Sequence, residues 1–376
     1  MRKTLFILEN LGNGGAEHVL PNLLKFLDSQ KYDITVLTLF ADGANRERIP
    51  DGVRCFCRRA PYFRGITYLV KLLPPKFLYW YFVKRLFKNK KFDVAIAYMH
   101  GLPTKIVAGA PHKKITWLHG NLLGGYIPPL RKNFLTFSGM RYCLSRLDAV
   151  AGVSQAICES FQKYTGIDKA PILIHNTNDV EEIRRLASEP SPYDKNANCV
   201  EIVTVGHLQS VKGNDRLLEA AKRLKGEGFS FHITILGEGP DRAALEGFLR
   251  DNGLQEMVSL PGHIANPYPY IQNADFYICP SRSEGFSTAV SEAVILGVPV
   301  ISTRVSGATE ILGEHDEFGI VCDNSTDGIY EGLKKMLENS ELRQHYAEQS
   351  RKRAVIFEPT QTVGDVEQLI DQVLKG

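Results

Sequence analysis

Two glutamates, Glu284 and Glu292, are separated by seven residues and follow a short apolar run. The run Phe276–Cys279 is typical of a buried strand, and the apolar spacing from about 286 to 296 indicates a helix. Glu284 is then expected in the loop between the two elements, and Glu292 about two turns into the helix. Both carboxylates can face one cleft, where ionised oxygens accept strong hydrogen bonds.

The residues directly after Glu284 can supply backbone N–H donors to the same cleft. If the helix begins near Phe286, the N–H groups of Gly285, Phe286 and Ser287 have no partner within the helix, and they can bind an anion or sugar hydroxyls. The plainer interpretation is a strand, a loop and a helix that carries two solvated glutamates.

A second segment has the layout of a phosphate-binding loop. The expected strand Val200–Val205 is followed by Gly206, a short loop with Lys212-Gly213, and a helical pattern. Glycine lets the backbone approach a ligand, and the lysine supplies positive charge. A single Lys-Gly pair has little specificity by itself.

The first domain offers weaker signals at the ends of its expected strands. Gly12-x-Gly14 resembles a dinucleotide fingerprint, but Glu17 occupies the third glycine position, so a tight strand–helix turn explains the pattern equally well. His119 follows an apolar strand and could be functional or structural. His100 occupies the end of a neighbouring strand and competes with His119 for such a role.

Short apolar runs alternate with amphipathic segments along the whole chain. This alternation predicts an α/β protein whose parallel sheets are covered on both faces. At 376 residues, the chain exceeds the usual size of a single core. The polar, proline-containing stretch 179–198 predicts a boundary between a Rossmann-like domain at 1–180 and another at 181–376. The helical pattern Val363–Leu374 could return to the first domain, and the two domains are expected to face a central cleft.

Composition excludes several classes of protein. A net charge of +3 does not favour nucleic acid as a partner. The seven scattered cysteines are typical of reduced thiols in a cytosolic protein. The N-terminal apolar run is too short for a signal peptide and indicates a first strand, and no run has the length of a transmembrane helix. No Asp-x-Asp stretch is present, which argues against a metal ion held by carboxylates. No cofactor is expected.

The segment 281–303 closely resembles the signature of the retaining glycosyltransferases of family 4, which have the GT-B fold. Glu284-Gly285-Phe286 and Glu292 match it at the right spacing. The resemblance implies that Glu292 accepts hydrogen bonds from the donor ribose. It also implies that Glu284 and the amides of residues 285–287, ending at Ser287, contact the transferred sugar.

The resemblance extends to 203–219, where the family reads Gly-Arg-Leu, three residues, then Lys-Gly. Gly206, Lys212 and Gly213 match, but His207 replaces the arginine. A neutral imidazole is a weaker partner for a diphosphate than a guanidinium. Either His207 is protonated by the diphosphate, or Lys212 acts mostly alone.

Other implied donor contacts are spread over both domains. The resemblance places the amides of Gly14 and Gly15 against the diphosphate, His119 near the donor sugar and acceptor, and His263 and Ile264 near the nucleobase. Glu310 is interpreted as a structural residue at a helix start.

The interval between Asp51 and Asp93 contains eleven Lys or Arg, no acidic residue, and interleaved aromatics. This composition suits either a helical insertion with a solvated basic face or a surface that binds an anionic membrane. RNA would suit it too, but no RNA-reading motif is present. The basic residues assigned to a membrane or acceptor patch are Arg64, Lys71, Lys76, Lys84, Arg85 and Lys88.

Together these features predict a metal-independent hexosyltransferase with Glu284, His119 and Lys212 as catalytic residues. It would move a sugar from a nucleotide diphosphate sugar, a UDP-sugar before a GDP-sugar, to a glycan acceptor. A lipid-linked acceptor in bacterial surface polysaccharide assembly would place the enzyme in the cytoplasm, on the inner face of the membrane. The alternatives are an enzyme of the same architecture, such as an epimerase or a phosphorylase, and a non-catalytic accessory subunit.

Overall fold

The structure is a computed structural model that describes the chain except residues 13, 61–69, 89, 124–132, 192 and 194–198. The chain separates into two compact units, 1–178 with 359–376, and 179–358. Each unit contains a parallel sheet with helices on both faces, which confirms the expected α/β class with two Rossmann-like domains. The second unit ends at Glu358, and the residues after it belong to the first unit.

The described strands of the first unit form a seven-stranded parallel sheet in the order β3-β2-β1-β4-β5-β6-β7. Its central strands are almost wholly buried because both faces of the sheet are covered. The edge strand β3 was not predicted, since its side chains alternate between exposed and half-buried. The strands are β1 (Arg2–Leu8), β2 (Tyr32–Thr38), β3 (Arg54–Cys57), β4 (Val94–Ala97), β5 (Lys113–Leu118), β6 (Ala149–Gly152) and β7 (Ile172–Leu173).

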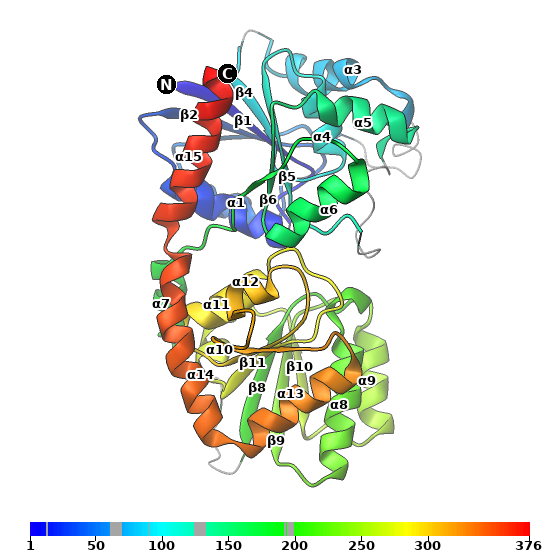
Figure 1. Ribbon diagram of the computed structural model, residues 1–376, viewed down its shortest axis with the longest axis vertical. Helices are drawn as coiled ribbons and strands as arrows, with labels where there is room; N and C mark the ends of the chain where they lie inside the picture. Colours follow the sequence, from blue (N-terminus) through cyan, green and yellow to red (C-terminus); the bar gives the residue numbers. More distant parts are fainter. Residues whose placement is uncertain (13, 61–69, 89, 124–132, 192, 194–198) are drawn as a thin grey trace. The chain divides into compact units, whose positions relative to one another are not determined.

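Helices α3, α4 and α5 of the first unit pack together on one face of the sheet, and α1 and α15 pack on each other (Figure 1). Local signals fix several ends: Ser154 caps α6 by accepting the Ile157 amide, and Gly166 ends it in the left-handed conformation. The helices are α1 (Gly15–Phe26), η1 (Ala44–Arg48), α3 (Pro75–Tyr79), η2 (Trp80–Lys84, a π-helix), α4 (Leu102–Ala108), α5 (Phe137–Ser145), α6 (Gln155–Thr165) and α15 (Pro359–Lys375).

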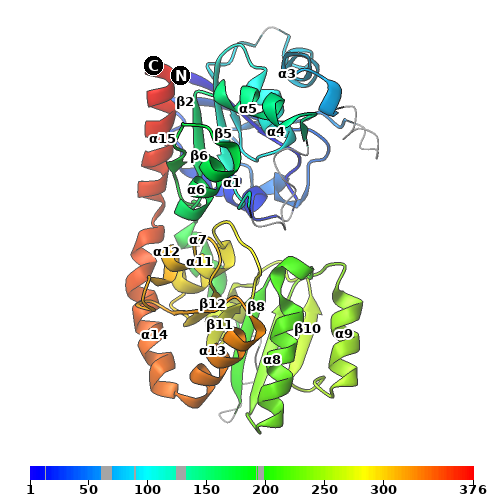
Figure 2. The ribbon, with the colours of Figure 1, turned by 45° about the vertical axis from the view of Figure 1, so that its right-hand side comes forward.

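The last helix, α15, completes the first unit, as Figure 2 shows with the two termini side by side. Its apolar side chains are buried, and its acidic residues contact the amino-terminal strands. Glu367 accepts from Lys31 Nζ at 2.8 Å, and Asp371 accepts from the Tyr32 hydroxyl at 3.3 Å and pairs with Arg2.

The second unit contains a six-stranded parallel sheet in the order β10-β9-β8-β11-β12-β13. Strand β10 was not predicted, because its segment was interpreted only as a nucleobase loop. The strands are β8 (Val200–Val205), β9 (Phe231–Leu236), β10 (Val258–Gly262), β11 (Phe276–Cys279), β12 (Val300–Thr303) and β13 (Ile320–Cys322).

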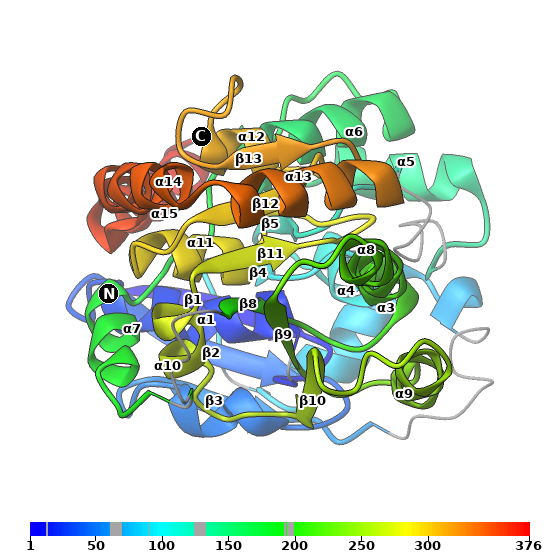
Figure 3. The same ribbon diagram turned by 90° about the horizontal axis from the view of Figure 1, so that it is seen from below.

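Helices α8, α9 and α13 cover one face of this sheet, and α7, α10, α11 and α14 lie on the other (Figure 3). Part of the stretch interpreted as a polar connection is the helix α7, whose Val180, Ile183 and Ala187 are buried. The helices are α7 (Val180–Ala187), η4 (Ser210–Lys212), α8 (Asn214–Gly226), α9 (Arg242–Asp251), α10 (Tyr268–Asn273), α11 (Thr288–Ile295), α12 (Ala308–Leu312), α13 (Thr326–Glu338), α14 (Ser340–Arg353) and η5 (Ala354–Phe357).

Candidate active site

A pocket lies at the carboxyl ends of β8 and β11, where the strand order of the second sheet reverses. Open α/β sheets bind ligands at this kind of reversal, because the two outgoing loops diverge and leave a crevice. The pocket is lined by Thr204, Val205, Gly206, Lys212, Asn214, Tyr277, Cys279, Pro280, Ser281, Glu284 and Ser287.

The loop that carries Lys212 is held against the exit of β11 by a glycine. Gly213 has φ +69°, and a Cβ there would lie 2.0 Å from the Pro280 carbonyl oxygen. Any other side chain would therefore be strained and would separate the two loops. The Arg216 guanidinium also donates to the Pro280 carbonyl, at 2.7 Å. These contacts fix Lys212 beside the residues that follow β11.

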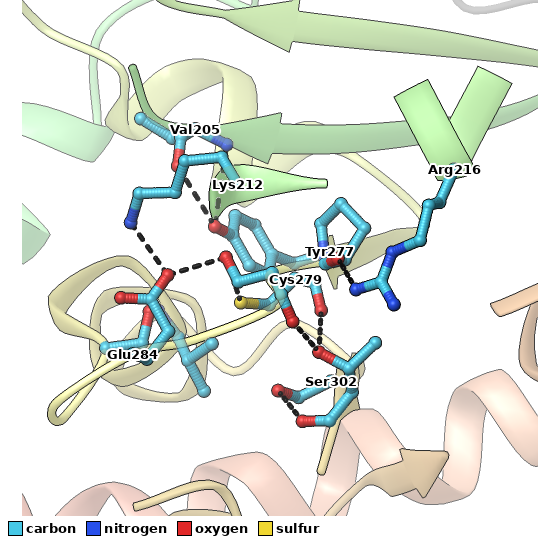
Figure 4. A network of polar contacts seen from close by, with 12 residues as sticks. Val205, Lys212, Arg216, Tyr277, Cys279, Glu284 and Ser302 are labelled. Atoms are coloured by element: carbon cyan, nitrogen blue, oxygen red, sulfur yellow. Dashed lines mark hydrogen bonds and ion pairs between the residues drawn. The ribbon is translucent and has the colours of Figure 1, made fainter. Parts of the chain in front are cut away.

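Lys212 and Glu284, predicted from separate motifs, form one ion pair (Figure 4). Lys212 Nζ donates to Glu284 Oε1 at 2.7 Å, and the Ser281 hydroxyl donates to the same oxygen at 2.6 Å. The two charged side chains are only 27% and 12% exposed. Burial lowers the pKa of Lys212, but the adjacent Glu284 carboxylate outweighs burial and raises it overall. Lys212 is therefore a fixed cation in this pocket.

The wall behind this ion pair is a buried polar network. Thr303 Oγ1 donates to the Ser281 carbonyl at 2.6 Å and contacts the Cys279 carbonyl at 3.3 Å, tying the end of β12 to the loop. Burial raises the pKa of the Cys279 thiol and raises that of the Tyr277 hydroxyl well above its usual value, so both groups are neutral. Sequence reasoning placed Cys279 in the core and missed Ser281 and Tyr277 as pocket residues.

A second ion pair, which was not predicted from the sequence, holds the same two loops in position. The Arg282 guanidinium donates to both carboxylate oxygens of Asp215, at 2.6 Å each, and to the Ser210 carbonyl at 2.7 Å. The hydrogen bond from Arg282 holds the pKa of Asp215 below its usual value. Asp215 lies three residues after Lys212, but no feature of the sequence identified Arg282 as the partner of Asp215.

Glu292 lies on α11 and is 7% exposed. The Tyr268 hydroxyl, on α10, donates to Glu292 Oε1 at 3.2 Å. Because α11 begins at Thr288, Glu292 lies about one turn into the helix rather than two. Glu292 is therefore a buried carboxylate already oriented by a neutral donor.

The loop 285–287 differs from the predicted helix start. Ser287 is the N-cap residue of α11, and its hydroxyl accepts the Val290 amide at 3.4 Å, so Gly285, Phe286 and Ser287 precede the first turn instead of forming it. Phe286 is buried, and its ring would be 2.9 Å from a Cβ at Gly307. The loop is therefore positioned by packing and by its serine cap.

The residues on the β8 side have unequal roles. His207 is exposed, and its Nδ1 lies 3.1 Å from the Glu238 carbonyl, which fixes the ring beside the loop after β9. Gly206 contributes space: a Cβ there would be 3.5 Å from the methylene groups of Lys212. His263 and Ile264 directly follow β10; His263 is exposed and Ile264 is half-buried.

In the first unit, Gly14 is the N-cap residue of α1, and Gly15 is the first residue of that helix. A Cβ at Gly14 would lie 2.3 Å from a carboxylate oxygen of Glu17, whereas a Cβ at Gly15 would meet no atom within 4 Å. His119 follows β5, and its ring lies 4.9 Å from that of Tyr98. Burial lowers the pKa of His119 to about 3, so its imidazole is neutral.

Within the basic segment, residues 75–88 form α3, η2 and the turn after them. Its buried face consists of Leu78, Tyr79, Phe82 and Val83, as a packed helix requires. The opposite face exposes Phe77 (42%) and Trp80 (47%), whose rings lie 5.6 Å apart. Of the basic residues assigned to the patch, Lys76, Lys84, Arg85 and Lys88 are exposed and Lys71 is half-buried, while Arg64 lies outside the described residues.

Comparisons with known proteins agree with this arrangement. The family model described as Glycosyltransferase Family 4 matches residues 13–182, and the model described as Glycosyl transferases group 1 matches residues 188–353. The chain therefore belongs to the family 4 glycosyltransferases of the GT-B fold.

Among curated relatives, the chain is similar to the Campylobacter jejuni N-acetylgalactosamine-N,N'-diacetylbacillosaminyl-diphospho-undecaprenol 4-alpha-N-acetylgalactosaminyltransferase. The two are 28% identical over 97% of this chain and 98% of that protein. The capsular polysaccharide biosynthesis glycosyltransferase CapM of Staphylococcus aureus is 27% identical over 40% of each chain. The chain is thus a glycosyltransferase whose relatives act in glycan and polysaccharide biosynthesis.

Solved structures share the fold over the whole length. Anabaena HepE in complex with UDP and glucose superposes with a TM-score of 0.77 and 19% identity, covering 99% of this chain and all of that one. WaaG, a glycosyltransferase involved in lipopolysaccharide biosynthesis, gives a TM-score of 0.72 at 16% identity, covering 99% of this chain and all of that one.

Proposed function

We propose that this glycosyltransferase moves a sugar from a UDP-sugar to a hydroxyl of a lipid-linked glycan, with retention of the anomeric configuration. The observation that carries the proposal is the partly buried Lys212–Glu284 ion pair at the strand-order reversal of the second sheet. A cation fixed there can stabilise the charge that develops on a departing nucleotide diphosphate. Lys212 would then do the work that a metal ion does in other transferases.

The remaining pocket residues have complementary tasks in this proposal. Glu292 accepts hydrogen bonds from the ribose hydroxyls, Glu284 accepts from the transferred sugar, and the loop 285–287 supplies backbone donors. His207 adds a single imidazole contact to the diphosphate. The acceptor class and the UDP donor are supported by the name of the Campylobacter jejuni relative and by the UDP-bound HepE structure.

The proposal predicts that UDP is released only when an acceptor is supplied. The protein should be incubated with UDP-sugars, with and without undecaprenyl-diphosphate-linked glycans, and with EDTA in a parallel series. We expect equal amounts of UDP and extended glycan, unchanged by EDTA, and an α-linked product from an α-linked donor by the anomeric proton coupling in NMR. Epimerised donor formed without acceptor would identify the epimerase alternative, and binding without turnover would identify an accessory subunit.

We also propose that the exposed face of α3, η2 and the following turn binds anionic membranes. Phe77 and Trp80 are aromatic side chains suited to the interface, and Lys76, Lys84, Arg85 and Lys88 complement anionic headgroups. Among the described residues, no helix is long and apolar enough to cross a membrane. A surface contact would bring the enzyme to a lipid-linked acceptor.

Flotation with vesicles of phosphatidylglycerol and phosphatidylcholine tests this surface. Charge reversal at Lys84, Arg85 and Lys88 should lower vesicle binding by at least roughly 100-fold, since each basic residue contributes about 1 kcal/mol near an anionic surface. Reversal of the exposed Lys222, Lys335 and Lys352 of the second unit is the matched control.

Trp80 provides an independent signal, because the only other tryptophan, Trp117, is 2% exposed. Its fluorescence should shift to the blue with anionic vesicles, and Trp80→Phe should abolish the shift. Equal flotation of the two triple variants would contradict the membrane proposal.

A further inference from the structure

Arg353, the last residue of α14, is bound to the carboxyl end of another helix, α12. Its Nε donates to the Ile311 carbonyl at 2.9 Å, and a terminal nitrogen of the same guanidinium donates to the Glu310 carbonyl at 2.6 Å. The guanidinium also lies over the ring of Phe318, 4.7 Å from its centroid. These three contacts hold the end of α14 against the end of α12.

The helix that Arg353 holds is very short. α12 has five residues, and Glu310 and Ile311 are among the last of them, where backbone carbonyls have no amide partner within the helix. A helix of this length is not stable alone, so contacts from outside decide where it lies. The half-buried guanidinium stays charged, and a cation at the carboxyl end of a helix is favourable. Arg353 is therefore a main anchor of α12.

The amino end of α12 packs against the loop 285–287. Gly307 is the N-cap residue of α12, with φ +77°, and a Cβ there would lie 2.9 Å from the Phe286 ring and 3.2 Å from the Gly285 carbonyl oxygen. Only glycine fits so close an approach. Phe286 is 4% exposed, so its ring has no free space to move into. A shift of α12 would therefore displace the loop 285–287.

The last turn of α14 also holds α11, through a separate bond. Ser350 is wholly buried, and its hydroxyl donates to the Val298 carbonyl at 2.9 Å. The Val298 amide in turn donates to the Ala293 carbonyl of α11 at 3.0 Å. Because this bond does not involve Arg353, loss of the guanidinium should move α12 and leave Glu292 of α11 in place.

We propose that Arg353 is a positioning residue for the transferred sugar: it fixes α12, and α12 sets the place of the loop 285–287. The inference rests on the proposed function, in which this loop supplies backbone donors to the sugar. It assigns to Arg353 an effect on the sugar end of the donor and none on the nucleotide end, where Glu292 is proposed to bind the ribose.

Removal of the guanidinium should weaken binding of the whole donor but not of the nucleotide. Arg353→Met keeps an apolar stem and removes both hydrogen bonds, whereas Arg353→Lys keeps a cation that can donate to the same carbonyls. Isothermal titration calorimetry compares UDP with the tightest binder among UDP-glucose, UDP-galactose and their N-acetylated forms. We expect Arg353→Met to bind that UDP-sugar about 10-fold more weakly and UDP equally well, and Arg353→Lys to recover most of the loss. A general loss of structure would weaken both ligands.

Lys352→Met is the matched control, because Lys352 is exposed in the same turn of α14, and it should change neither affinity. Gly307→Ala disturbs the other end of α12 and should give the same selective loss. The double variant Arg353→Met/Gly307→Ala should lose less than the sum of the two, because both changes act through one helix.

Three results would overturn the inference: equal weakening of UDP and the UDP-sugar in Arg353→Met, unchanged affinity for both, or fully additive losses in the double variant. Failure of the proposed function is distinct, because the wild type would then transfer sugar from none of the four donors.

Discussion

Replacing Lys212 with methionine is expected to lower kcat/KM by about 10²–10³-fold, the typical effect of removing one preorganised group that stabilises developing negative charge. Methionine keeps the length and the apolar stem of the side chain, so the loop held by Gly213 should retain its shape. The measurement is steady-state transfer with UDP release, together with the melting temperature of each variant. Because Glu284 raises the pKa of Lys212 above its ordinary value of 10.5, the loss should be equally large across the neutral pH range.

The control for this experiment is Lys222→Met, since Lys222 is exposed on α8 of the same unit. A double-mutant cycle with Glu284→Gln then tests whether the ion pair acts as a unit. Lys212→Met in the Glu284→Gln background should cost clearly less than in the wild type, because the two side chains share a hydrogen bond of 2.7 Å. Full transfer activity in Lys212→Met would contradict the role of Lys212 on which the proposed function rests.

Glu292→Gln is expected to weaken UDP binding by roughly 10- to 100-fold, since hydrogen bonds to a charged group contribute about 1.5–3 kcal/mol. The amide oxygen of glutamine can still accept from the Tyr268 hydroxyl, so the buried contact between α10 and α11 remains. Isothermal titration calorimetry with UDP measures the change. The variant and the wild type should bind 2',3'-dideoxy-UDP with nearly equal affinity, because that ligand lacks the hydroxyls that Glu292 is proposed to bind.

Glu331→Gln, at an exposed position on α13, provides the matched control and should leave UDP affinity unchanged. If Glu292→Gln discriminated between UDP and its dideoxy form as strongly as the wild type does, the carboxylate would not be the ribose ligand.

Much of the second unit could be predicted from the sequence because its strands are short, continuous apolar runs bounded by glycine, proline and polar loops. The motifs of Lys212 and Glu284 were each recognised, but the ion pair between them depends on the pairing of β8 with β11, which neither motif contains. The boundary of α11 was wrong because Phe286 continues the apolar spacing of the helix, whereas the Ser287 cap decides where the helix starts.

Contacts between residues that are far apart in the sequence could not be predicted from it. Tyr268 and Glu292 are far apart in sequence, and so are Asp215 and Arg282, and neither spacing carries a local signal. Strand β3 was missed because a half-exposed edge strand lacks an apolar run. In the first unit, the register that places Ala97 of β4 opposite Thr116 of β5 depends on strand pairing, which periodicity alone does not reveal.

The position of α15 has a consequence for how the chain is made. The first unit needs both ends of the chain, because α15 contributes the buried side chains and the Glu367 and Asp371 contacts that cover β1 and β2. Synthesis proceeds at roughly 5–20 residues per second from the amino terminus. All of the second unit, which ends at Glu358, therefore leaves the ribosome while the first unit still lacks the helix α15. The unit encoded first is the last to be complete.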